Sequence, residues 1–131
     1  MSCPSAICTS LTNASVSAGG SAGFGAPVRR YGSACQLSGN GIDLYGPGYF
    51  SVVASMTIAT TEAGPVTLQF YQDNAEVVGA CATAQATAGD PVNLTVPFMF
   101  RNCGHSCNST LTYTVSAAGE IASFPVNVIK R

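Results

Sequence analysis

The residues of this chain that could do chemistry by type and spacing lie in the segment RNCGHSCNS, at positions 101–109. Cys103, His105 and Cys107 alternate there with small residues, and thiolate and imidazole groups are ligands that zinc prefers. A zinc site would need a fourth ligand from elsewhere, or three copies of the set around a threefold axis. A disulfide between Cys103 and Cys107 that clamps the loop is the interpretation we favour, ahead of free thiols and of zinc.

His105 is the only histidine, so a nucleophile–base pair would have to join it to one of these two cysteines. A loop that contains glycine and serine gives no rigid hold on the imidazole, and no buried carboxylate is indicated nearby to orient it. The acidic residues lie mostly in turn-like sequences, where aspartate caps the backbone and glutamate stays solvated. The sequence therefore predicts no catalytic residue, no cofactor and no enzyme activity.

The other four cysteines stand outside this segment. Cys3 and Cys8 are close enough in sequence for a second local disulfide. Cys81 falls in a strand pattern and is predicted to be a small buried apolar residue. Cys35 is isolated, and the sequence alone does not place it.

The composition indicates one domain with an unusually neutral surface. Charged residues make up 8% of the 131 residues, whereas about a quarter is typical of soluble domains. Because a monomer needs charge to stay soluble, the shortage favours self-association or a larger assembly. The net charge of −1, and the lack of any basic cluster larger than a pair such as Arg29-Arg30, argue against nucleic acid as a partner.

Nothing in the sequence predicts a membrane partner or an export signal. No apolar run approaches the roughly 20 residues that a transmembrane helix needs. The first residues lack the basic leader and continuous apolar stretch of a signal peptide. We therefore expect synthesis in a host cytoplasm and, if the protein reaches the outside, release with a virus particle.

Alternating hydrophobicity predicts an all-β domain. From Gly48 to Val96 the sequence reads as four consecutive antiparallel strands, and in the first of them apolar residues recur at every second position: Phe50, Val52, Ala54, Met56 and Ile58. Further strands are predicted at 30–37, 42–45, 110–115 and 121–129. About eight strands with turn sequences between them indicate a sandwich or closed barrel, with the last strand in the middle of the body.

Residues 1–28 differ from the remainder of the chain. They are rich in serine, alanine and glycine, contain few large apolar residues and show no helical or strand period of useful length. The composition predicts an extended N-terminal arm that packs along neighbouring subunits or a platform protein, followed by a folded domain at 29–131.

The order of three motifs resembles the jelly roll of tumour necrosis factor and the complement globular heads. The motifs are Gly48-Tyr49-Phe50, then Val66-Thr67 with Tyr71 and Val77, then Gly89-Asp90-Pro91-Val92. The resemblance covers about residues 42–131 and implies an antiparallel jelly-roll sandwich. It also implies a homotrimer packed about a threefold axis through one sheet face, with these interface candidates: Tyr49, Tyr71, Tyr113 and Val126.

A compact neutral jelly roll with an unusual cysteine-bearing loop is also similar to small structural proteins encoded by bacteriophages. That resemblance implies a non-enzymatic virion surface protein, either a capsid decoration protein or a head fibre component, attached to the capsid through residues 1–28. Two alternatives stay open. One is a receptor- or glycan-binding tip that uses the 101–109 loop, and the other is a secreted, cytokine-like trimeric ligand.

Overall fold

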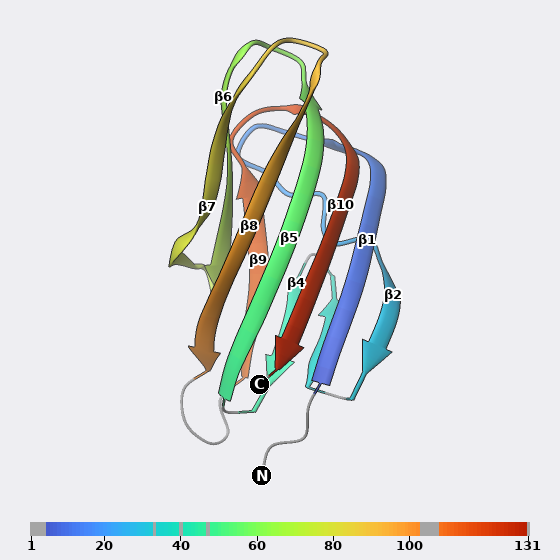
Figure 1. Cartoon of the computed structure of the whole chain (residues 1–131), viewed down its shortest axis with the longest axis vertical. Coiled ribbons are helices and arrows are strands. Elements are labelled where there is room, and N and C mark those ends of the chain that lie inside the picture. Colours follow the sequence, from blue (N-terminus) through green and yellow to red (C-terminus); the bar gives the residue numbers. More distant parts are fainter. Residues whose placement is uncertain (1–4, 33, 40, 47, 103–107, 131) are drawn as a thin grey trace.

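A computed structural model describes residues 5–32, 34–39, 41–46, 48–102 and 108–130. These residues form ten strands and no helix, arranged as two packed antiparallel sheets (Figure 1). The strands are β1 (Ser5–Val16), β2 (Ala26–Tyr31), β3 (Cys35–Ser38), β4 (Gly41–Tyr45), β5 (Gly48–Thr60), β6 (Gly64–Gln72), β7 (Ala75–Ala86), β8 (Pro91–Asn102), β9 (Asn108–Val115) and β10 (Gly119–Lys130).

Each sheet has five strands. Sheet A has the order β2-β1-β10-β5-β8, and sheet B has the order β3-β4-β9-β6-β7. The last strand, β10, lies in the centre of sheet A between β1 and β5, which confirms the predicted central position of the C-terminal strand. The all-β sandwich is also confirmed, although two more strands are present than the pattern predicted.

The core lies between the two sheets and has an aromatic centre. The five alternating apolar residues of β5 are all fully buried, as their period predicted. Phe24, Phe70, Tyr113 and Phe124 form a cluster with ring centroids between 4.8 and 6.4 Å apart. Because Phe24 comes from the connection between β1 and β2, the N-terminal region is part of this core.

The predicted N-terminal arm is wrong for residues 5–28, while residues 1–4 lie outside the described part. β1 pairs with β10 from Ser5↔Lys130 to Val16↔Gly119 and also pairs with β2 on its other side. Its inward positions include Ile7 and Thr9, which are 1% and 0% exposed. A strand held on both sides buries small residues as well as large ones. The folded domain therefore begins by Ser5 instead of at residue 29.

The strand predicted at 30–37 is two strands, β2 and β3, which belong to different sheets. Gly32 lies between them with φ at +77°, a left-handed conformation that glycine adopts without steric cost. The chain leaves sheet A at this point and enters sheet B, so one run of residues serves both layers.

Candidate functional site: the solvent face of sheet A

Large apolar side chains that stay exposed gather on sheet A. Five such side chains occur among the described residues, and all of them belong to strands of this sheet: Val28, Tyr49, Val53, Met99 and Ile129. Their exposed fractions range from 42% to 65%. A gathering of this kind on one face is typical of an interaction surface, whereas single exposed apolar residues are ordinary.

The strand register brings most of these side chains together near one end of the sheet. Ser51 on β5 lies opposite both Ile129 of β10 and Met99 of β8. Two residues further along β5, on the same face, Val53 lies between Asn127 and Pro97. We call this surface the apolar face and define it by these residues: Ala6, Tyr49, Val53, Pro97, Met99 and Ile129.

The apolar face contains a shallow depression of about 320 Å³. It is lined by residues of four strands: Ala6, Ile7, Cys8, Arg29, Val53, Asn127 and Ile129. The small side chains of Ala6 and Cys8 on β1 leave the hollow between the longer Arg29 of β2 and Ile129 of β10. A cavity with this lining can receive an apolar side chain of a partner.

The other half of the same solvent face is polar and satisfied by its own hydrogen bonds. The Nδ2 group of Asn93 donates to Ser55 Oγ at 3.0 Å and to Thr57 Oγ1 at 3.2 Å, and the Thr95 hydroxyl donates to Asn93 Oδ1 at 2.8 Å. Serine, threonine and asparagine here are neutral groups that pair with one another. This half lacks the exposed apolar surface of the opposite end.

Sheet B presents a hydroxyl-rich solvent face with one carboxylate network. The Thr110 hydroxyl donates to Asp43 Oδ1 at 2.9 Å, and the Tyr45 hydroxyl donates to Asp43 Oδ2 at 3.3 Å. Partial desolvation, followed by the Asp43 charge and hydrogen bond, raises the pKa of Tyr45. Within the described residues, no group of three histidine, cysteine, aspartate or glutamate side chains is arranged to hold a metal ion.

The predicted zinc or disulfide residues Cys103, His105 and Cys107 lie outside the described residues, as does Cys3. Cys8 has a free thiol on the solvent face of sheet A. The prediction for Cys81 is wrong, because its side chain is exposed on β7. Cys35 is fully buried on β3, at the opposite edge of sheet B from β7, and burial raises the pKa of its thiol to about 11 despite the opposing effect of Lys130.

Two of the four predicted interface residues cannot contact a neighbouring subunit. Tyr113 and Val126 are 1% and 0% exposed because both point between the sheets. Tyr71 is half-buried on the solvent side of sheet B, where its hydroxyl accepts a hydrogen bond from Thr114. Only Tyr49 lies on the apolar face, with half of its surface exposed.

Sequence reasoning missed the other members of the apolar face, although a signal for them was present. Consecutive apolar residues occur at Val52-Val53, Phe98-Met99-Phe100 and Val128-Ile129. In a strand, neighbouring side chains point to opposite faces, so one member of each pair must leave the core. Doubled apolar positions on adjacent strands therefore indicate a second apolar face.

Comparisons with solved structures identify the fold. Murine APRIL at pH 5.0 superimposes with a TM-score of 0.78 at 9% identity, covering 98% of this chain and all of that chain. The globular domain of zebrafish complement 1qA gives 0.65 at 7% identity, with 95% and 94% covered. The chain has the jelly-roll fold of these proteins. The vertex protein P5 of PRD1 gives 0.61 at 12% identity, with 97% of this chain and 72% of that one covered.

At these identities the likeness shows the fold alone. No protein-family model and no curated protein sequence matches the chain. The fold class predicted from the motif order is nevertheless confirmed, because the three structures cover nearly all of the chain, including β1 and β2. No helix in the described part of the chain has the length and apolar character needed to cross a membrane.

Proposed function

We propose that this protein is a non-enzymatic, homotrimeric structural component of a virus particle, displayed on the virion surface as a decoration or fibre protein. The observation that carries the proposal is the apolar face of sheet A. A surface of this kind, on a chain with few charges, needs a partner that removes it from water. A second and third copy of the same chain supply that partner.

The free energy available from this face fits an oligomer interface. Tyr49, Val53, Met99 and Ile129 keep 42% to 59% of their surfaces exposed. Fully burying such a side chain contributes about 1.5–3 kcal/mol, so covering the exposed half contributes about 1 kcal/mol each. The four together supply about 4 kcal/mol per subunit, and contacts around them must supply the remainder of the cost of association.

The edge strands of the two sheets support a contact in which an edge strand of one subunit lies against the apolar face of the next. Three of the four edge strands have features that hinder pairing with a strand of another molecule. β2 contains Pro27, β3 has only four residues, and β8 contains Pro91 and Pro97. The remaining edge, β7, has an irregular pairing with β6 around Gly79, but beyond it residues 80–86 pair regularly and contain neither proline nor charge. Long unprotected edges are normally covered in native proteins.

A contact between an edge of one subunit and the apolar face of the next is heterologous, because it uses two different surfaces of the same chain. Heterologous contacts close into a ring when the rotation between neighbours permits it. A threefold ring of this kind would cover both the β7 edge and the apolar face in every subunit. The two unpartnered surfaces are then explained by one assembly.

Similarity to the PRD1 vertex protein supports the virion part of the proposal. The attachment that we expected from an N-terminal arm needs revision, because β1 is held in sheet A along its whole length. Attachment to a capsid protein is therefore proposed to use the surface of the folded sandwich. The likeness to murine APRIL supports a competing proposal, a trimeric ligand, which would bind a cell surface instead of a particle.

The trimer is tested by light scattering on the purified chain and on a Val53→Asp, Met99→Asp variant. We expect three times the chain mass for the wild type and a single chain mass for the variant, because two carboxylates would be buried at the contact. The matched control is Thr112→Asp on the solvent side of sheet B, which should stay trimeric. A wild-type monomer, or a variant that remains trimeric, would contradict the proposal.

A further inference from the structure

The start of β7 projects from the side of the sandwich. Tyr71 of β6 pairs with Glu76 and Gln69 pairs with Cys81, so residues 77–80 of β7 stand opposite a single residue of β6. Extra residues in one strand leave the ladder and bend that strand. Figure 1 shows β7 bending outwards at this point. We call residues 77–80 the β7 bulge.

The β7 bulge is held in place by the side chain of Gln69. Its Nε2 group lies within hydrogen-bond reach of Phe70 O at 2.8 Å, Val77 O at 3.2 Å and Ala80 O at 3.4 Å. Gly79 takes a left-handed φ of +84°, and nothing lies within 4 Å of the place where a Cβ would stand. The bulge is therefore a fixed projection with open space around it.

The depression on the apolar face of sheet A is a matching concave surface. Arg29, Cys8, Asn127 and Val53 form one row across four neighbouring strands, and all four line the depression of about 320 Å³. We call these residues the Arg29 row. The short side chain of Cys8 in the middle of the row lets a neighbouring molecule approach the sheet closely.

The two surfaces carry charges of opposite sign. β2 has two cations, Arg29 and Arg30, and no anion, whereas the corner from β6 to β7 has two anions, Asp73 and Glu76, and no cation. Arg29 and Glu76 are both exposed. Within the described part of the chain, neither of these two side chains has an ion-pair partner.

The other charged residues near this corner are engaged within their own chain. Asp73 Oδ1 accepts a hydrogen bond from Thr110 N–H at 2.9 Å, and Asp43 Oδ1 accepts one from the Thr110 hydroxyl at 2.9 Å. The half-buried Lys130 directs its Nζ group to Tyr45 O at 3.5 Å. These contacts leave Glu76 as the carboxylate that is available to a partner.

Arg101 does not neutralise Glu76, although β8 and β7 are neighbouring edge strands. Arg101 pairs with the exposed Tyr49, on the solvent face of sheet A. Glu76 pairs with Tyr71, whose side chain is on the solvent side of sheet B. The two charged side chains therefore diverge from their common edge.

We propose that the β7 bulge of one subunit seats in the depression of the next subunit of the trimer, where Glu76 pairs with Arg29. This inference rests on the proposed trimer and specifies which residues meet. The occupant of the depression is a second copy of this chain, because the chain carries the projection, the depression and one unpaired charge of opposite sign beside each. The contact is heterologous, so a ring uses both surfaces of every subunit.

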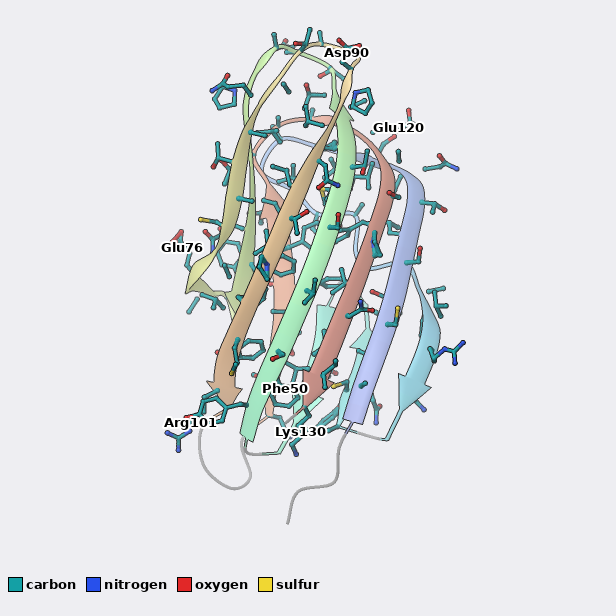
Figure 2. All side chains as sticks on the ribbon, viewed as in Figure 1. Phe50, Glu76, Asp90, Arg101, Glu120 and Lys130 are labelled. Atoms are coloured by element: carbon teal, nitrogen blue, oxygen red, sulfur yellow. The ribbon has the colours of Figure 1, made fainter. Side chains whose placement is uncertain are left out.

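The positions of the two surfaces along the long axis suit a ring. Figure 2 places Glu76 between the levels of Phe50 and Asp90. The Arg29 row meets β5 at Val53, three residues or about 10 Å beyond Phe50 in the direction of Asp90. Neighbours in a ring around this axis stand at the same level, so the bulge needs no large axial shift to meet the row.

The ion pair sets the register of the contact, while apolar burial holds the subunits together. Charges at the rim of an interface favour one partner and one register over others. Exposed ion pairs are individually weak and are screened by salt. Each trimer contains three copies of the pair, so reversing one charge per subunit should raise the concentration of half-dissociation about tenfold in dilute salt.

Light scattering over a dilution series measures this effect in Arg29→Glu, in Glu76→Arg and in the variant that carries both. Each single variant should show the tenfold rise, and the double variant should return near the wild-type value because the charges are exchanged. The matched control is Glu62→Arg, in the connection from β5 to β6, which should match the wild type. Unchanged single variants, or losses that simply add in the double variant, would overturn the pair. A wild-type monomer at every concentration would instead refute the trimer.

A disulfide tests the seating independently of charge. Under mild oxidation, Glu76→Cys should bond to the native Cys8 of the next subunit, because Cys8 lies beside Arg29 in the row. A non-reducing gel should then show chains joined in twos and threes, more than in the wild type. Adding Cys8→Ser should abolish this product, and Glu62→Cys should not form it. A folded, trimeric Glu76→Cys variant without the product, or a product that survives Cys8→Ser, would overturn the seating.

Discussion

Replacing Tyr113 with phenylalanine should weaken the attachment of the connection between β1 and β2 to the core. The Tyr113 hydroxyl donates to Gly23 O at 2.6 Å and accepts from Ala22 N–H at 3.2 Å. Both partners belong to the segment that carries Phe24 between the sheets. The substitution keeps the ring and its packing, so it removes these two hydrogen bonds and little else.

The expected loss follows from burial. Tyr113 is 1% exposed, so water cannot easily replace the missing hydroxyl beside Gly23 O and Ala22 N–H. Each net hydrogen bond contributes about 1 kcal/mol, and an unpaired buried group costs about 1–3 kcal/mol. We expect the free energy of unfolding to fall by about 2 kcal/mol, which corresponds to about 6–10 °C in Tm for a domain of this size.

Urea denaturation followed by circular dichroism measures this loss, with protein concentration held fixed because any oligomer couples to unfolding. The midpoint should fall while the slope stays unchanged. The control is Tyr71→Phe, because that hydroxyl is half-buried and has only a 3.4 Å contact with Thr114. Equal losses in the two variants would refute the reasoning from burial.

Three further substitutions test other parts of the sandwich by the same denaturation assay. The pKa of Cys35 rises from its ordinary 9.0 to about 11, so the wild type should lose stability as pH climbs from about 9 to 11, by up to about 2–3 kcal/mol, whereas Cys35→Ala should lose less; equal slopes would contradict this. Thr9→Val should gain about 1 kcal/mol, because the Thr9 hydroxyl is buried without a partner, and a loss would show that the hydroxyl is satisfied. Gly25→Ala should cost about 2 kcal/mol or more, because φ is +79° and the new Cβ would collide with the backbone of Ser10; Gly39→Ala, which has a similar φ in open space, should cost less, and similar costs would contradict the collision.

The alternation of apolar and polar residues was enough to predict the central strands. β5 and β6 have one buried face and one solvated face, so their period of two appears directly in the sequence. The same reasoning failed for β1, whose neighbours on both sides supply the backbone pairing and allow Thr9 to occupy a core position. The composition of residues 5–16 shows that they are small, but it does not reveal that β2 and β10 pair with them.

The prediction that Cys81 is buried failed for a different reason. The pairing of β6 with β7 shifts register between Gln69 and Tyr71, and Gly79 adopts φ at +84° on the opposite strand. An extra residue in one strand reverses which side chains face the core beyond it. Ala80 is therefore buried and Cys81 exposed, an outcome that a continuous period through β7 could not reveal.

The placement of charge connects the fold to the proposed trimer. Between its ends, the solvent face of sheet A has one charged side chain, Arg29 on the edge strand β2, which pairs with Cys8. A neutral face suits a contact between subunits, where a buried charge would be costly. Added salt leaves apolar burial intact or strengthens it, whereas it screens contacts between exposed charges. The trimer should therefore persist when salt is raised, and dissociation in concentrated salt would show that the contact depends on charge.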